Sequence, residues 1–306
     1  MRAVVTKSTG SWYDVKDETG KVWQARIKGK LRLKGLKSTN PVAVGDFVEI
    51  EPEGTTGLAL ISDIAERKNY IIRKSNNLSK QTQVIAANLD QAVLFVTLAR
   101  PRTSLGFIDR FLVTAEAYHI PVILAFNKID IYDEVDTAIL MEYSSIYESI
   151  GYDCIQVSAK MGTNISALKE KLEGKTTLVS GHSGSGKSTF LNSISPEIQQ
   201  KTAEISDYSL KGKHTTTFAE MFEIEGRTRI IDTPGIKDFG VVDLEQVEIS
   251  HYFREMKPLI GQCRFNNCIH VNEPGCAILR AVESGAIRPE RYYSYLGILN
   301  NEDAHH

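Results

Sequence analysis

The sequence predicts three domains: an all-β barrel, a central α/β domain, and a helical segment built around clustered cysteines. Short strands separated by turn signals fill the first part of the chain. Apolar runs alternate with amphipathic helical patterns in the middle, and three of the four cysteines lie close together near the end. We place the domains at residues 1–72, 73–240 and 241–306, an ordinary division for 306 residues.

Composition and charge set the broad class. The hydrophobic fraction of 42% and charged fraction of 24% are typical of a globular protein. The sequence has neither an apolar run of membrane-spanning length nor the apolar core of a secretory signal, so we expect a cytoplasmic protein without a membrane partner. We also expect a monomer. The net charge of −2 divides into +5 for residues 1–75 and −7 for the remainder. This asymmetry suggests a polyanionic partner for the first domain.

The first domain reads as roughly five short strands, for which an OB-fold barrel is the leading candidate. Within residues 26–35, charged residues alternate with apolar residues and glycines, so a strand would carry all the charges on one face. RNA binding is one interpretation of this basic stripe, and a solvated strand face is the other. The tryptophans and Tyr13 fit core packing better than base stacking. The stripe consists of Arg26, Lys28, Lys30, Arg32 and Lys34.

The central domain contains a phosphate-binding motif. GHSGSGKS, residues 181–188, matches G-x-x-x-x-G-K-[ST] and lies between a strand-like TTLVS and a helix-like STFLNSI. Glycines in such a loop let backbone N–H groups approach phosphates closely. We expect Lys187 to bridge the β- and γ-phosphates and Ser188 to bind Mg²⁺. The whole predicted loop is Ser180, Gly181, His182, Ser183, Gly184, Ser185, Gly186, Lys187, Ser188 and Thr189.

Two further elements follow the phosphate loop. Asp232-Thr233-Pro234-Gly235 fits the D-x-x-G element of GTPases, in which Asp232 holds Mg²⁺ through water and the Gly235 amide binds the γ-phosphate. Between them, GKHTTT at 212–217 is interpreted as a switch with a magnesium-binding threonine. Thr216 and Thr217 are both candidates, and a plain surface loop is the alternative.

A base-reading loop precedes the phosphate loop. In NKID, which consists of Asn127, Lys128, Ile129 and Asp130, the asparagine fits the guanine edge and the lysine fits the base plane. The aspartate can accept from the guanine N1–H and N2–H₂ donors, which adenine lacks. Ser158-Ala159-Lys160 matches the last GTPase element, whose backbone amide contacts the guanine oxygen. Both elements end apolar strands, where open α/β sheets bind ligands.

The order of these elements is a circular permutation of the usual GTPase, in which the phosphate loop comes first. Domain termini tend to lie close together, so such a permutation is tolerated. Ile236, where many GTPases carry a glutamine, can neither donate nor accept a hydrogen bond. We therefore predict slow intrinsic hydrolysis. His214 is the best internal candidate for orienting water, although a solvated loop histidine is an equal alternative.

The clustered cysteines predict a structural metal site. Cys263, Cys268, His270 and Cys276 form a Cys₃His set with the ligands of tetrahedral Zn²⁺ and no open position for catalysis. In a reducing compartment, such a cluster favours metal binding over disulfides. Three helix-like stretches, 247–260, 276–285 and 289–299, surround it.

The barrel, the early NKID and the Cys₃His cluster together resemble the ribosome small-subunit-dependent GTPase A family over essentially the whole chain. The resemblance implies a GTP hydrolase that binds the small ribosomal subunit and its rRNA, assists late maturation and is stimulated by the subunit. Its cofactors would be one structural Zn²⁺ and Mg²⁺ with GTP. Two competing readings remain: a metabolic P-loop kinase, disfavoured by NKID and SAK, and a nucleotide-dependent RNA-binding switch with incidental turnover.

Overall fold

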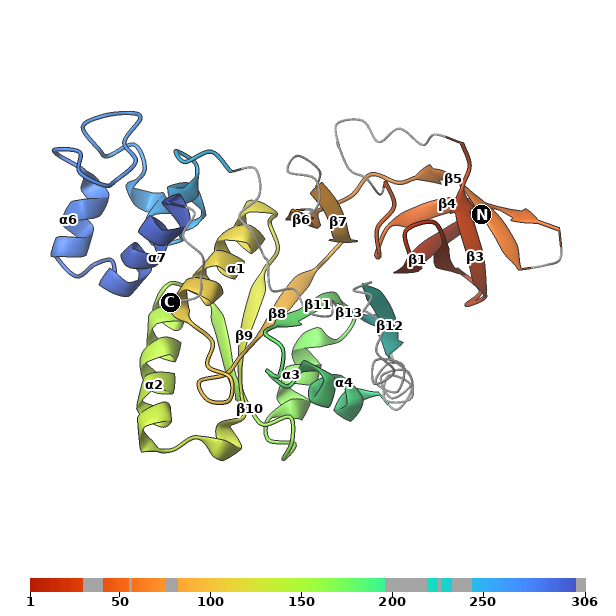
Figure 1. Ribbon diagram of the computed structural model, residues 1–306, viewed down its shortest axis with the longest axis horizontal. Coiled ribbons are helices and arrows are strands. Elements are labelled where there is room, and N and C mark those ends of the chain that lie inside the picture. The colour runs from red at the N-terminus through yellow and green to blue at the C-terminus, as the bar shows by residue number, and fades with distance from the viewer. Residues whose placement is uncertain are drawn as a thin grey trace, which may run out of the picture.

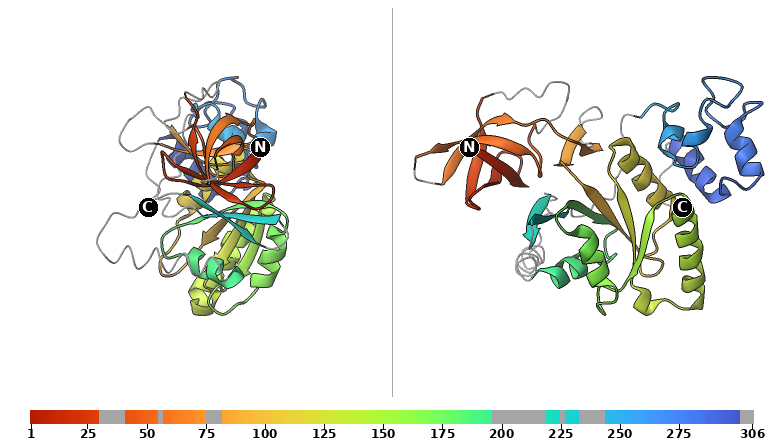
Figure 2. Two further views of the ribbon diagram at one scale, coloured as in Figure 1. Left: turned by 90° about the vertical axis from the view of Figure 1, so that its right-hand side faces the viewer. Right: turned by 180° about the vertical axis from the view of Figure 1, so that it is seen from behind.

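The computed structural model describes residues 1–29, 41–54, 57–74, 82–195, 219–224, 227–232 and 244–300. It arranges the chain as a barrel, a central α/β unit and a helical C-terminal unit (Figure 1). The view from behind shows the central unit between the other two (Figure 2). Among the described residues, no helix combines the length and apolar character needed to cross a bilayer.

The N-terminal unit is a closed five-stranded barrel, as the sequence predicts. Its strands pair in the order β1-β2-β3-β5-β4, and a β1–β4 pairing closes the ring. Alternate side chains enter the core, so Trp23 and Tyr13 are buried, as expected, whereas Trp12 is exposed. The strands are β1 (Arg2–Ser8), β2 (Tyr13–Asp17), β3 (Val22–Ile27), β4 (Phe47–Glu53) and β5 (Leu58–Ile64).

The central unit continues the same sheet in the order β10-β9-β8-β11-β13-β12. All neighbours are parallel except β12, which pairs antiparallel with β13 at the edge. The strands are β8 (Gln91–Val96), β9 (Val122–Asn127), β10 (Asp153–Val157), β11 (Thr176–Gly181), β12 (Glu220–Ile224) and β13 (Thr228–Asp232). Strands β8, β9 and β11 are buried along their whole length because helices cover both faces of the sheet, whereas β10 is only partly buried.

The helices divide between the two faces of this sheet. Helices α1 (Leu105–Ala117) and α2 (Glu134–Ser149) pack on the face that carries Leu94 and Leu124. Helices α3 (Ile165–Leu172) and α4 (Lys187–Ile194) pack on the face that carries Val93. From β8 the chain proceeds outward to β9 and β10, then returns to β11 on the other side of β8. The gap between β8 and β11 is therefore a topological switch point, the usual ligand position in such sheets.

A hairpin that the sequence analysis did not anticipate follows the barrel. Strands β6 (Tyr70–Lys74) and β7 (Thr82–Ala87) form a separate two-stranded sheet. The domain boundaries expected at 72–73 and 240–241 stay predictions.

The C-terminal unit is only partly as expected. Helices α6 (Ala277–Glu283) and α7 (Pro289–Leu299) confirm two of the three helical stretches. In the third, 247–260, the chain forms two 3₁₀ turns, η3 (Ile249–Tyr252) and η4 (Lys257–Leu259), instead of one helix. The continuous helix was a wrong prediction because Phe253 is extended (φ −94°, ψ 113°) and fully buried. Its ring packs edge-on against Tyr295, so core packing overrides helical periodicity here.

Candidate nucleotide and metal sites

The predicted phosphate loop lies at the end of β11 and leads directly into α4. Gly181, Gly184 and Gly186 all have positive φ, which L side chains rarely adopt. At Gly186 (φ 96°) a Cβ atom would lie 2.1 Å from Nδ2 of Asn127. This glycine is therefore required both by its own backbone conformation and by the close approach of the base-reading loop.

Lys187 is buried at the start of α4, inside the curve of the loop. Its Nζ donates to the carbonyl oxygens of Gly181 at 2.6 Å and His182 at 2.8 Å. Burial lowers the pKa of Lys187, whereas the negative charge of Asp232 raises it. The ammonium group is thus held by two carbonyl oxygens of the phosphate loop, where a bound phosphate group would need a positive charge.

Oxygen ligands suited to Mg²⁺ lie at the ends of neighbouring elements. Asp232 ends β13, and its register partner on β11 is Val179, just before the loop. Ser188 is exposed in the first turn of α4. A carboxylate and a hydroxyl are hard oxygen donors of the kind Mg²⁺ prefers, so these residues fit that ion.

Asn127 joins the three predicted nucleotide elements. It is 1% exposed at the end of β9. Its Nδ2 donates to the carbonyl oxygen of Ser185 in the phosphate loop at 2.8 Å. Its Oδ1 accepts from the backbone N–H of Ala159 at 2.9 Å. Segments far apart in the sequence thus meet through one side chain, which the sequence analysis had expected only to face the base.

The rest of the base-reading loop is also fixed by side-chain contacts. Asp130 accepts from the hydroxyl of Ser158 at 2.5 Å. Lys128 has a left-handed backbone (φ 69°), and its Nζ donates to the carbonyl oxygen of Arg100. Ile129 lies in a 3₁₀ turn, and Lys160 is exposed at the rim.

Tyr132 and the segment after β8 are parts of the site that the sequence reasoning missed. The Tyr132 hydroxyl donates to the carbonyl oxygen of Asn127 at 2.6 Å and accepts from the N–H of Leu98 at 3.0 Å. Burial raises its pKa to about 12, so it stays a neutral donor. His182 stacks on Phe107 of α1 with ring centroids 3.8 Å apart. No sequence motif marks Tyr132, Leu98 or Phe107, because their role depends on tertiary packing, whereas His182 belongs to the predicted phosphate loop.

Several predicted residues lie outside the described residues, among them both candidate threonines of the switch. They are His214, Thr216, Thr217, Gly235, Ile236, Lys30, Arg32 and Lys34.

The two described members of the basic stripe are exposed, as the alternation of side chains predicts, but each has an acidic partner. Arg26 pairs with Glu53 at 3.4 Å, and Lys28 pairs with Glu51 at 2.5 Å.

The four predicted metal ligands form one compact cluster. The ligand atoms of Cys263, Cys268, His270 and Cys276 all lie within 4.8 Å of one another. Nδ1 of His270 is 3.4 Å from the sulfur of Cys276 and 3.6 Å from that of Cys263. Ligands on a tetrahedral Zn²⁺ ion with Zn–S bonds of about 2.3 Å stand roughly 3.8 Å apart, so the donor set and its size fit the ion.

The surroundings of the cluster suit thiolates that are bound to a cation and a neutral imidazole. The N–H groups of Ala277 and Leu279, at the start of α6, point at the sulfurs of Cys263 and Cys276 at 3.3 and 3.4 Å. Burial raises the pKa of Cys268 to about 12, so this thiol needs a nearby cation to ionise. Burial lowers the pKa of His270, which keeps its ring neutral and able to bind a metal.

Together the sheet order and the loops define a class of protein. The phosphate loop lies at a topological switch point of the sheet. The NKID and SAK loops come from strands earlier in the chain, and the Asn127 side chain bonds both the phosphate loop and the SAK loop. This arrangement defines a circularly permuted P-loop GTPase.

Comparisons with known proteins support this class over nearly the full length of the chain. A family model described as RsgA GTPase matches residues 64–242, and one described as RsgA N-terminal domain matches residues 4–58. The chain belongs to the RsgA GTPase family and is a GTP hydrolase.

Relatives and solved structures cover nearly the whole chain. The "Small ribosomal subunit biogenesis GTPase RsgA 2" of Bacteroides thetaiotaomicron is 54% identical over 99% of this chain and 97% of its own length. The RsgA of Christiangramia forsetii is 53% identical with the same coverage. The crystal structure of YjeQ from Thermotoga maritima matches with a TM-score of 0.78, 35% identity and 98% of both chains. That of YloQ, described as a circularly permuted GTPase, gives a TM-score of 0.72 at 29% identity, covering 98% of this chain and 94% of that one.

Proposed function

We propose that this GTPase binds GTP where the NKID, SAK and phosphate loops meet, and that it acts on the small ribosomal subunit during late maturation. The observation that carries the site is the Asn127 side chain, which bonds the phosphate loop and the SAK loop together. The proposed nucleotide contacts are Asn127, Lys128, Ile129, Asp130, Ser158, Ala159, Lys160 and residues 180–189.

Each residue of this site has a chemical role. Asp130, oriented by Ser158, accepts from the two guanine donors and thereby discriminates against adenine. Lys187 exchanges its bonds to the loop carbonyls for phosphate oxygens. Mg²⁺, held by Ser188, by Asp232 through water and by Thr216, would neutralise charge developing on the phosphates. The Gly235 amide and His214 complete the proposed catalytic set.

The subunit and its RNA are the proposed macromolecular partners. Relatives at 54% and 53% identity are described as small ribosomal subunit biogenesis GTPases. The proposed RNA contacts are Arg26, Lys28, Lys30, Arg32 and Lys34 on the barrel. The Arg26 and Lys28 side chains are more than half exposed, at 56% and 53%, so phosphates can replace their glutamate partners. Such a protein would work as a monomer in the cytoplasm, with one structural Zn²⁺ in its C-terminal unit.

Ile236 cannot orient water, so we expect intrinsic hydrolysis to be slow. The small subunit is the proposed partner that stimulates it, as the family resemblance implies. The test is GTP hydrolysis by the full chain with and without purified small subunits, with ATP as competitor. We expect turnover to rise at least about tenfold with subunits, equivalent to about 1.4 kcal/mol of barrier, and excess ATP to leave it unchanged.

Unstimulated turnover combined with tight subunit binding would instead indicate a nucleotide-dependent RNA-binding switch. Effective competition by ATP would indicate a P-loop kinase.

A further inference from the structure

One row of paired residues runs from the barrel to the proposed magnesium site. Lys7 of β1 is the register partner of Glu220 on β12. Glu220 is in turn the register partner of Asp232 on β13. The barrel therefore places a lysine two strands away from the carboxylate expected to hold magnesium.

The two carboxylates in this row lie on the same face of the sheet. Side chains alternate along β12 and β13, so Glu220 shares its face with Phe222, and Asp232 shares its face with Ile230. Phe222 and Ile230 pack in the core cluster that contains residues of α4, the helix that begins at Lys187. Glu220 is thus a second acidic group on the nucleotide side of the sheet.

This arrangement has an electrostatic consequence. Directly opposed residues of an antiparallel pair have Cβ atoms about 5 Å apart, and like charges in these positions repel. Lys7 offsets the charge of Glu220, because its Nζ lies 3.4 Å from a carboxylate oxygen. The Glu220 side chain is 14% exposed, so water screens it weakly.

We propose that Glu220 and Lys7 are positioning residues that set the magnesium affinity of the nucleotide site. Glu220 strengthens the negative potential around Asp232 and favours the cation, and Lys7 of the barrel weakens it. Docking of the barrel on β12 thereby adjusts the catalytic centre. This inference rests on the proposed function, in which Asp232 holds Mg²⁺.

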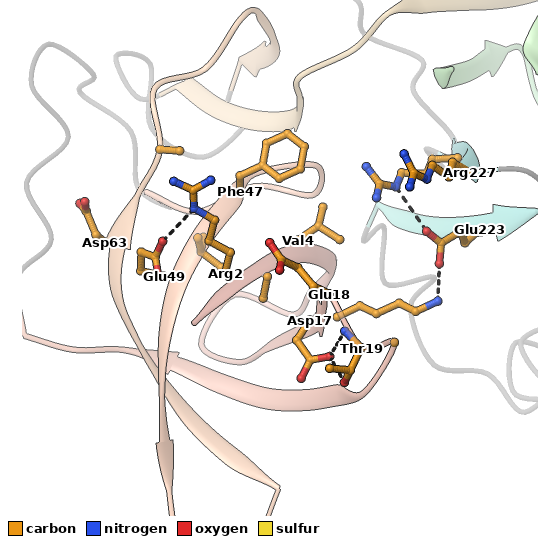
Figure 3. A pocket seen from close by; sticks show the side chains of 16 residues that line it. Arg2, Val4, Asp17, Glu18, Thr19, Phe47, Glu49, Asp63, Glu223 and Arg227 are labelled. Carbon is orange, nitrogen blue, oxygen red and sulfur yellow. Dashed lines mark hydrogen bonds and ion pairs between the residues drawn. The ribbon is translucent and has the colours of Figure 1, made fainter. Parts of the chain in front are cut away.

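A matched control pair lies on the opposite face of β12. Lys16 of β2 pairs with Glu223 of β12, whose register partner is Arg229 instead of Asp232. These residues help line a cavity of about 850 Å³ between the barrel and the β12–β13 hairpin, where Glu223 faces the barrel (Figure 3). Breaking this pair loosens the same junction without changing the charge opposite Asp232.

The experiment measures how Mg²⁺ slows the release of fluorescent GDP from the full-length protein. Glu220→Gln should raise the magnesium concentration needed for half-maximal retention by about threefold, and Lys7→Gln should lower it by a similar factor. The double variant should return close to the wild type. Lys16→Gln and Glu223→Gln should leave the magnesium concentration unchanged.

The opposite signs separate this proposal from simple docking. If the Lys7–Glu220 pair only held the barrel in place, both single variants would shift magnesium affinity in one direction, and that outcome would overturn the inference. Shifts of equal size in the Lys16 and Glu223 variants would overturn it too. Two results would refute the proposed magnesium site itself, and the inference with it. One is a rate of GDP release from the wild type that does not depend on Mg²⁺. The other is an Asp232→Asn variant whose magnesium dependence equals that of the wild type.

Discussion

The side-chain amide of Asn127 lies 2.8 Å from the carbonyl oxygen of Ser185, a residue 58 positions further along the chain. The same amide group occupies the space that a Cβ atom on Gly186 would need. The base-reading loop and the phosphate loop are therefore fitted to each other by contacts within the chain itself. Such contacts reduce the ordering cost that a ligand would otherwise have to offset.

Replacing Gly186 with alanine tests this fit. The new Cβ would lie 2.1 Å from Nδ2 of Asn127 and would stand on a backbone with φ 96°. We expect nucleotide affinity to fall at least about tenfold and stability to fall by about 1–3 kcal/mol. Binding of fluorescent GDP and urea unfolding measure the two effects.

Gly174→Ala is the matched control for backbone strain alone. Gly174 also has positive φ (69°), but no described atom lies within 4 Å of the point where its Cβ would stand. The Gly174→Ala variant should lose about 1 kcal/mol of stability and should bind nucleotide with the affinity of the wild type. Equal losses of affinity in the two variants would show that strain, and not contact with Asn127, limits this site.

The second prediction concerns the Cys₃His cluster. Removing the metal with a strong chelator should lower the melting temperature and loosen the loop between Cys263 and Cys276, because the bonds from the four ligands to one ion no longer hold the loop together. His270→Gln should lower bound zinc from one ion per chain towards none, as read by native mass spectrometry. Cys154→Ser is the control, since Cys154 lies outside the cluster. A melting temperature insensitive to the chelator would contradict a structural metal.

Motifs contiguous in the sequence were predictable, whereas contacts between distant segments were not. The residues of GHSGSGKS carry their loop conformation in their own glycines, so sequence was sufficient to locate that strand-to-helix turn. The bonds of Asn127 to Ser185 and Ala159 depend on how three strands end at one edge of the sheet. Helical periodicity also gave a wrong prediction over residues 247–260, because burial of the Phe253 ring overrides the local preference for a helix.

Asp17 gives the barrel a defined pH dependence. Hydrogen bonds from the side chains of Thr19 and Trp23 lower its pKa from 3.8 to about 2. A carboxyl group whose folded-state pKa is depressed stabilises the fold above its unfolded-state pKa. That stability is lost as the pH falls towards the folded-state value, so the relevant window here is about pH 4 to pH 2.

The measurement is the stability difference between the wild type and Asp17→Asn. In urea unfolding, the advantage of the wild type should shrink steadily as the pH falls through this window and should be constant above about pH 5. Subtracting the variant removes the contribution of the other carboxyl groups. An advantage that stays constant from pH 5 to pH 2 would mean that the bonds to Thr19 and Trp23 do not depend on the charge of Asp17.

The last prediction concerns the attachment of the C-terminal unit. Arg291 of α7 is 1% exposed and pairs with Asp109 of α1 and with Glu255, at 2.6 Å for the latter. Tyr147 of α2 also donates to Asp109 at 2.7 Å. Arg291→Met would leave two buried carboxylates without their cation, which costs about 3–5 kcal/mol. We expect loss of hydrogen-exchange protection along α7 and a lower urea midpoint.

A second ion pair across the same junction is the control. Arg254 pairs with Glu116 at 2.7 Å, but both side chains are substantially exposed, at 31% and 24%. Breaking a partly solvated pair costs about 0–1 kcal/mol, so Arg254→Met should leave α7 protected. Adding Asp109→Leu and Glu255→Leu to Arg291→Met should recover much of the stability, because no buried charge then remains uncompensated. Equal destabilisation by Arg291→Met and Arg254→Met would show that the buried network does not hold α7 against α1.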